Sequence, residues 1–94
     1  MHEASYKVPG GKLVKAKVRV EAGRIAEIII LGDFFLHPEE TLQKIEDALR
    51  GTLAKEASIE RVISKVLTES DAIIIGATAQ DMAKTIMLAF ASTS

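Results

Sequence analysis

The residues with the clearest potential for chemistry are a proline, two glycines and a lysine in Pro9-Gly10-Gly11-Lys12. Phosphate-binding loops combine glycine and lysine as Gly-x-x-x-x-Gly-Lys-Ser/Thr at the start of a helix. Here Tyr6 stands where the first glycine is required, Leu13 replaces the hydroxyl residue, and a strand pattern follows. A phosphate loop is therefore not expected. Two interpretations remain: a plain turn before a strand, and a backbone loop that comes close to a ligand or partner.

Acidic and histidine side chains can supply acid–base or metal chemistry, but their positions here indicate structural roles. Asp33 is expected in a turn, and Glu39 and Glu40 in the first turn of a helix, where the helix dipole favours negative charge. His37 precedes a proline and should be extended at a helix entrance, whereas His2 lies near a frayed terminus. No nucleophile, base partner or convergent ligand set accompanies them. We therefore expect neither a catalytic group nor a metal site in this chain.

Two further patterns concern surfaces rather than reactions. Lys15, Lys17 and Arg19 alternate with apolar residues, so they either attract an anion or form the solvated face of a strand, where lysines discourage edge pairing. Phe34 and Phe35 are adjacent in a chain that has only three phenylalanines. Because neighbouring strand residues face opposite ways, one of the two is expected in the core and the other exposed or in contact with a partner.

Length, charge and cysteine content limit the possible functions. The chain has 94 residues, a net charge of −1 and no cysteine. Its length predicts a single domain over residues 1–94, with a core from about residue 6 to 90. The near-neutral charge argues against binding to nucleic acid or to a membrane surface. Without cysteine, disulfides, thiol catalysis and iron–sulfur clusters are excluded. The sequence lacks a membrane-spanning apolar run, and its polar start is unlike a signal peptide, so we expect a cytoplasmic protein.

The elements that must position these residues begin with strands. Residues 12–21 alternate between apolar and charged side chains, which predicts a strand with one face in water. The isoleucine-rich run of residues 24–31 follows after Ala22-Gly23, so an antiparallel hairpin is expected, with Gly23 supplying the positive φ of its turn. Residues 34–36 are expected to add a short third strand.

Helix signals dominate the second half of the chain. Pro38 is expected to open the first helix, with Gly51 just beyond its end, and Ser58 to cap the second. Residues 71–75 fit a buried strand or an apolar loop, and we favour the loop. Thr78 and Asp81 form a capping pattern that starts a third helix.

The resulting order, β-β-β-α-α-α, predicts an α+β fold in which a three-stranded antiparallel sheet carries three helices packed on one face. The uncovered face of this sheet would present the basic stripe of Lys15, Lys17 and Arg19. The sequence shows neither an internal repeat nor a second domain.

Four strings resemble a known family. Residues 6–14 (YKVPGGKLV), 23–25, 32–40 (GDFFLHPEE) and 77–83 occur in the order and spacing of the small C-terminal domain of lipoate–protein ligases. The resemblance covers most of the chain; its first and third strings are fairly specific, whereas the helical half is generic.

This resemblance implies a function in partnership. In the family a large domain binds lipoate, ATP and Mg²⁺, forms lipoyl-AMP, and transfers the lipoyl group to a lysine of a lipoyl-domain protein. The small domain supports the adenylation step and is in some organisms a separate chain. This sequence begins with Met and comprises the small domain, so the resemblance implies an accessory subunit in a heterodimer with the large catalytic subunit. It is expected to bind no cofactor alone and to meet lipoyl-domain proteins indirectly.

The same resemblance suggests which residues face the partner or its active site. The candidates are Lys7, Gly10, Gly11, Lys12, Asp33, Phe34 and Phe35. The glycine corner would let a backbone approach, Lys7 or Lys12 would add charge, and a phenylalanine would anchor docking. Valine at Gly10 or Gly11 is accordingly expected to damage adenylation far more than folding. His37 receives no chemical role.

Two alternatives remain beside the ligase subunit. One is a protein-interaction or self-associating α+β module with no catalytic partner. The other is a scaffold for sulfur or cluster transfer, which the missing cysteine disfavours.

Overall fold

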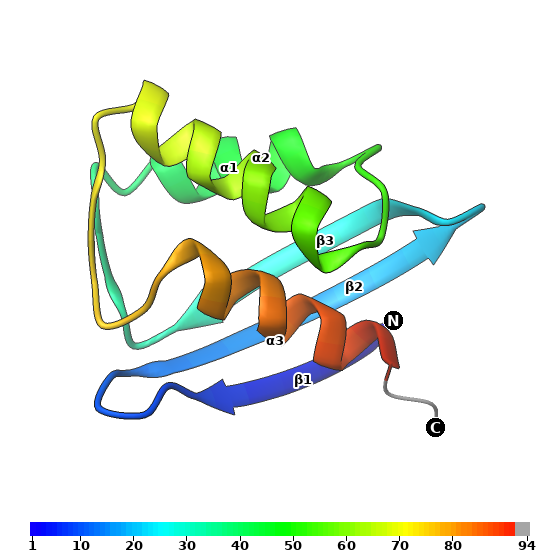
Figure 1. Ribbon diagram of the computed structural model, residues 1–94, viewed down its shortest axis with the longest axis horizontal. Helices are drawn as coiled ribbons and strands as arrows, with labels where there is room; N and C mark the ends of the chain where they lie inside the picture. The colour runs from blue at the N-terminus through cyan, green and yellow to red at the C-terminus, as the bar shows by residue number, and fades with distance from the viewer. Residues whose placement is uncertain (92–94) are drawn as a thin grey trace.

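A three-stranded antiparallel sheet, a separate two-stranded sheet and three helices make up the fold in the computed structural model, which describes residues 1–91 (Figure 1). The elements are β1 (His2–Lys7), β2 (Leu13–Glu21), β3 (Arg24–Gly32), β4 (Phe35–His37), α1 (Thr41–Leu49), α2 (Glu56–Glu69), β5 (Ile73–Ile75) and α3 (Ala79–Ala91). The α+β class is confirmed. The order β-β-β-β-α-α-β-α differs from the predicted β-β-β-α-α-α, because two strands were missed.

The first missed strand is β1, at the terminus that we expected to be frayed. It pairs antiparallel with β2, so that Ala4 lies opposite Ala16 and Tyr6 opposite Val14. Tyr6 is also tied to α3, since the Lys84 ammonium lies 4.7 Å from the centre of its ring. The strand pattern is weak in the sequence because half-buried Ala4 and Tyr6 alternate with exposed polar residues. Pairing with β2 therefore makes β1 the third strand of the main sheet.

The predicted hairpin of β2 and β3 is confirmed. Its turn holds Ala22 at φ 51° and Gly23 at φ 77°, the pair of positive values that a tight antiparallel hairpin requires. Arg19, one member of the predicted basic stripe, is paired with Glu21 and donates a hydrogen bond of 2.8 Å to Glu27 on the neighbouring strand. The hydrogen bond to Glu27 raises the pKa of Arg19. This part of the stripe is a set of exposed ion pairs.

The second missed strand is β5, which we expected to be a loop. It pairs antiparallel with β4, with Phe35 opposite Ile75 and His37 opposite Ile73. Residues 34–36 were expected to join the main sheet. Instead β4 lies in this separate two-stranded ribbon, and the third strand of the main sheet is β1, which lies beside β2. Three consecutive isoleucines have no period of their own, so only the pairing with β4 distinguishes the strand from a loop.

The starts of two helices differ from the prediction. Pro38 does not open α1, because Pro38–Glu40 form a turn in which the Pro38 carbonyl accepts a hydrogen bond from Thr41 N–H at 3.0 Å. The helix begins at Thr41, so Glu39 and Glu40 precede its first turn. α2 begins at Glu56, before the predicted cap Ser58. Gly51 follows the end of α1 as expected.

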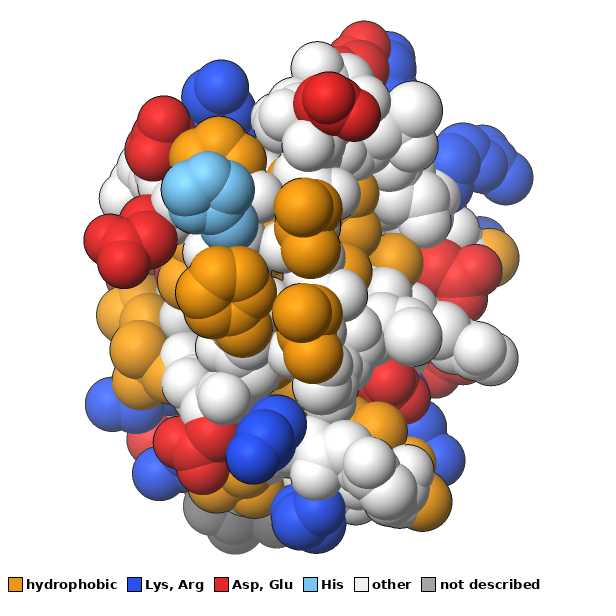
Figure 2. Space-filling view, turned by 90° about the vertical axis from the view of Figure 1, so that its left-hand side faces the viewer, with side chains coloured by type: hydrophobic (Ala, Val, Ile, Leu, Met, Phe, Trp, Pro, Cys, Tyr) orange, Lys and Arg blue, Asp and Glu red, His pale blue; other side chains and the backbone are white. Residues whose placement is uncertain are grey.

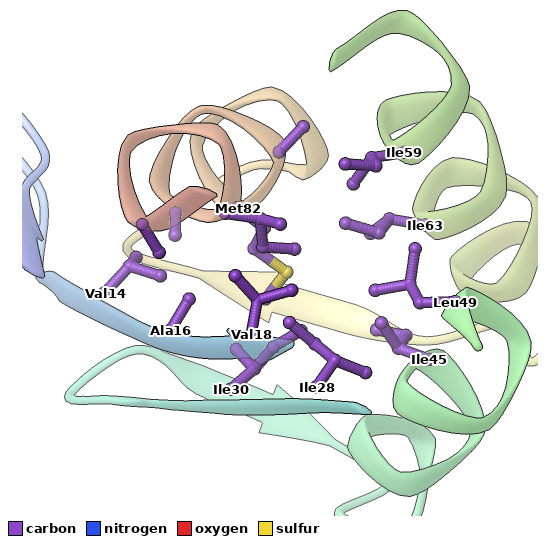
Figure 3. Packing of buried hydrophobic residues seen from close by; sticks show 14 of the residues in the cluster. Val14, Ala16, Val18, Ile28, Ile30, Ile45, Leu49, Ile59, Ile63 and Met82 are labelled. Carbon is purple, nitrogen blue, oxygen red and sulfur yellow. The ribbon is translucent and has the colours of Figure 1, made fainter. Parts of the chain in front are cut away.

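The core lies between the main sheet and the helices. Alternate residues of β2 and β3 point towards the helices, where Met82 of α3 meets them and Ile63 of α2 points into the same core (Figure 3). α3 contacts β1 and β2, α1 contacts β3, and α2 packs on the other two helices. The buried apolar residues are Val8, Val14, Ala16, Val18, Ile25, Ile28, Ile30, Leu36, Ile45, Leu49, Ile59, Ile63, Ala77, Met82, Ala83, Ile86 and Ala89.

The outer edge of β3 is covered by α1 and by the residues that directly follow this helix. Ile30 N–H donates to the Glu46 carboxylate at 2.8 Å, and Ile25 exchanges backbone hydrogen bonds with Gly51 and Thr52. These contacts use backbone groups that an open edge leaves free to pair with another chain. None of the helices in the described part of the chain has the length and hydropathy to span a bilayer.

Candidate functional site

Three connections that are distant in sequence meet at one end of the molecule, opposite to the N-terminus (Figure 1). They are the β1–β2 corner, the segment after β3 and the segment after β5. A Cβ atom at Gly76 would lie 2.5 Å from Lys12 Cγ and 3.6 Å from Phe34 Cα. The predicted candidates before β2 and after β3 are therefore brought together, with Gly76 between them. We call this contact of Gly11, Lys12, Phe34 and Gly76 the glycine junction.

The Pro9-Gly10-Gly11-Lys12 corner is a turn that is bonded to the rest of the fold. Gly11 N–H donates to the Val8 carbonyl and Lys12 N–H to the Gly76 carbonyl, both at 2.8 Å. An anion-binding loop needs such N–H groups free and pointing at the ligand. These two are used inside the protein, so the corner is not built as a phosphate cradle.

Gly11 itself is required by close packing. A Cβ atom there would lie 2.5 Å from the Gly76 carbonyl oxygen and 2.9 Å from Val8 Cγ1. A backbone oxygen cannot move aside without shifting the chain, so a larger residue at Gly11 disturbs the fold. The expectation that valine at this position spares folding is therefore revised. Gly10 differs, because it has φ 71° and nothing within 4 Å of an added Cβ.

The two candidate lysines have different surroundings. The Lys7 ammonium donates to the Gly11 carbonyl and, at 3.3 Å, to the Val8 carbonyl, so it holds the corner closed. Lys12 is exposed, and within residues 1–91 its ammonium takes part in no ion pair. Lys12 is therefore the lysine at the junction whose charge is open to a partner.

The two phenylalanines are separated as their adjacency predicted. Phe34 is half-buried and packs against the core, and its ring lies within 2.8 Å of where a Cβ at Gly32 would be. Phe35 is 55% exposed. Asp33, between them and β3, is exposed and its N–H donates to the Leu13 carbonyl at 3.0 Å. Phe35 is thus the phenylalanine available to a partner.

Phe35 belongs to a larger apolar surface that the sequence did not reveal. In an antiparallel ribbon the side chains of directly opposite residues share a face, so Phe35 and His37 of β4 lie beside Ile75 and Ile73 of β5. The Phe35 and His37 rings stack with centroids 6.3 Å apart, and Ile73 and Ile75 are 57% and 61% exposed. Figure 2 shows these apolar side chains gathered beside a histidine. We call the outward side chains of these four residues the ribbon face.

A hollow lies on each side of the ribbon face. One, of about 380 Å³, is lined mostly by apolar residues, among them Leu31, Phe35 and Leu42. The other, of about 430 Å³, lies between the Gly10-Gly11 corner and the start of α3, and Ile75 lines it. The predicted capping pattern is confirmed there, since Thr78 N–H donates to Asp81 Oδ2 at 2.9 Å and Asp81 N–H to Thr78 Oγ1 at 3.1 Å. The Asp81 carboxylate thus already occupies the positive end of α3.

Sequence reasoning missed Gly76, Ile73 and Ile75. The signal available for Ile73 and Ile75 was the run of three β-branched residues ended by glycine, which fits a short strand but does not distinguish it from an apolar loop. Across the described chain, no three His, Cys, Asp or Glu side chains are placed so that they could hold a metal ion.

Comparisons with known proteins agree on one family. The model of the bacterial lipoate protein ligase C-terminus matches residues 1–86. A curated relative, lipoate-protein ligase A subunit 2 of Thermoplasma acidophilum, is 36% identical over 62 residues, which are 66% of this chain and 60% of the relative. A chain in the structure of a bi-partite lipoate protein ligase and its E2 lipoyl domain from the same organism superposes with a TM-score of 0.75 and 26% identity. That superposition covers 92% of this chain and 97% of the other.

The fold and this end of the molecule define a small α+β domain whose prominent surface is an apolar ribbon beside a glycine-rich corner. The match over residues 1–86 identifies the family. This chain belongs to the family of lipoate protein ligase C-terminal domains, as the sequence resemblance implied.

Proposed function

We propose that this chain is the accessory subunit of a two-chain lipoate–protein ligase, and that it acts in the ATP-dependent formation of lipoyl-AMP. The observation that carries the proposal is the family match over nearly the whole chain. The likeness to a chain of a bi-partite ligase over 92% of this molecule supports a separate second subunit. In this proposal lipoate, ATP and Mg²⁺ are bound by the large subunit, which also meets the lipoyl-domain protein.

The physical contribution of a small subunit is to complete a site. Adenylation places extra negative charge on a phosphate, which oriented donors and cations stabilise best when water is excluded. Lys12 is exposed, and the Cβ and Cγ atoms of its side chain lie beside Gly76 at the glycine junction. In the proposal this end of the molecule closes against the active site of the large subunit, and Lys12 supplies charge there. Lys7, Asp33 and Phe34 support the shape of the same end.

The test separates adenylation from transfer. Lipoyl-AMP formation is measured as pyrophosphate release from ATP and lipoate, with the large subunit alone, this chain alone, and both together. We expect release only with both. In a second assay, chemically prepared lipoyl-AMP is supplied, and transfer to a lipoyl-domain protein is expected from the large subunit with or without this chain.

Two results contradict the proposal. One is full pyrophosphate release by the large subunit alone, because the accessory chain would then have no part in adenylation. The other is lipoylation of an acceptor protein by this chain alone, because the reaction centre would then lie within it.

A further inference from the structure

The ribbon face stands out because the outer edge of β5, one of its two strands, is unprotected. The outer edge of β3 is covered by Glu46 and Gly51, and β1, at the other edge of the main sheet, carries Glu3 and Lys7. Among residues 1–91, β5 makes backbone hydrogen bonds to β4 alone. It consists of three isoleucines without lysine or proline. Exposed apolar edges of this kind promote pairing with other chains, and natural proteins guard them or cover them.

The ribbon face is also continuous with both hollows. Phe35 lines the apolar hollow beside Leu31 and Leu42, and Ile75 lines the hollow beside the Gly10-Gly11 corner. A partner that covers the ribbon face therefore reaches the corner as well. The surface carries a protruding aromatic and aliphatic centre with a recess on either side, which is the form of an interface centred on a few anchor residues.

We infer that the ribbon face, with its two flanking hollows, is the surface on which the large catalytic chain of the ligase docks. The inference rests on the proposed function, from which it takes the occupant. It adds that docking uses Phe35, Ile73 and Ile75 as anchors, and that the Gly10-Gly11 corner and Lys12 are brought to the partner by the same contact.

The area of the surface favours a larger partner over a second copy of this chain. Phe35, Ile73 and Ile75 are each more than half exposed, so together they offer on the order of 300 Å² of apolar surface. Two such faces packed about a two-fold axis would bury about 600 Å², whereas a stable interface buries about 1,000 Å² or more. A large chain that also fills the hollows extends the contact beyond the ribbon face towards that size.

The experiment measures binding and activity in one titration. The large subunit is titrated with wild-type chain, Ile75→Asp, Phe35→Ala and the control Leu88→Asp, while pyrophosphate release is followed. Leu88 is a suitable control because it is 43% exposed on α3, outside the ribbon. Circular dichroism and urea unfolding verify that each variant is folded. Analytical ultracentrifugation of wild-type chain and Ile75→Asp alone reports self-association.

We expect Ile75→Asp to raise the concentration for half-maximal activity by about 30-fold or more, with the same plateau at saturation. Phe35→Ala should raise it by about tenfold or more, and Leu88→Asp should match wild type. The inference is overturned, with the proposed function intact, if wild type stimulates release and both ribbon variants titrate like Leu88→Asp. It is also overturned if Ile75→Asp abolishes a dimer of this chain but binds the large subunit normally. If wild type neither binds nor stimulates, the proposed function fails together with the inference.

Discussion

Residues of the same type at and beside the Pro9-Gly10-Gly11-Lys12 turn have different roles. Gly10 and Gly11 are identical in type and adjacent, yet one is required for its backbone conformation and the other for its lack of a side chain. Lys7 and Lys12 show the same division, since Lys7 bonds to the corner carbonyls and Lys12 projects from the junction. Structural and functional roles are thus separated residue by residue, within a segment that looks uniform in the sequence.

The contrast between the two glycines yields a stability prediction. Gly11→Ala places a Cβ 2.5 Å from the Gly76 carbonyl oxygen, and we expect it to lower the free energy of unfolding by about 2 kcal/mol or more. Gly10→Asn should lower it by less than about 1 kcal/mol, because asparagine tolerates positive φ and the site has open space. Urea unfolding at equilibrium measures both. Equal losses for the two variants would show that the contact with Gly76 is not the reason for glycine at position 11.

At the scale of elements, the start of α3 is fixed by its own capping box. The reciprocal bonds between Thr78 and Asp81 satisfy N–H groups that the first turn leaves unpaired. Local chemistry of this kind is readable in the sequence. The start of α1 is not, because the turn at Pro38–Glu40 delays the helix although proline and two glutamates are typical of a first turn.

The capping box can be tested on α3. Thr78→Ala is expected to lower the free energy of unfolding by about 1 kcal/mol, with Asp81→Ala similar in size. Because the two side chains bond to each other, the double variant should lose less than the sum of the single losses. Gln80→Ala, an exposed position in the same turn, is the matched control. Additive losses in thermal or urea unfolding would argue against a reciprocal contact.

At the scale of the whole molecule, the fold gathers three connections at one end and leaves a patch of apolar side chains exposed there (Figure 2). The core between the main sheet and the helices is complete without the ribbon face. Substitutions on the ribbon face and at Lys12 should therefore act on the assembled ligase rather than on folding.

The proposed role of Lys12 can be tested in the assembled ligase. Lys12→Gln removes a charge proposed to face the adenylation site, so the plateau of lipoyl-AMP formation should fall about tenfold or more while the half-saturating concentration stays near wild type. Ile75→Asp should show the opposite pattern. Lys15→Gln, on an exposed position of β2, is the control. A normal plateau for Lys12→Gln would remove Lys12 from the proposed active-site contribution.

The sequence by itself determined the parts of the fold that depend on neighbours in the chain. The alternation in β2 predicts a strand with one wet face, Gly23 the hairpin turn, and Thr78 with Asp81 the start of α3, because each signal is a local property. The family resemblance, too, was present in short strings.

The tertiary structure alone decided which segments pair and what they expose. β1 needed β2 as a partner, β5 needed β4, and the junction of Gly11 with Gly76 joins residues far apart in sequence. Such contacts depend on how the whole chain packs, so no local pattern encodes them.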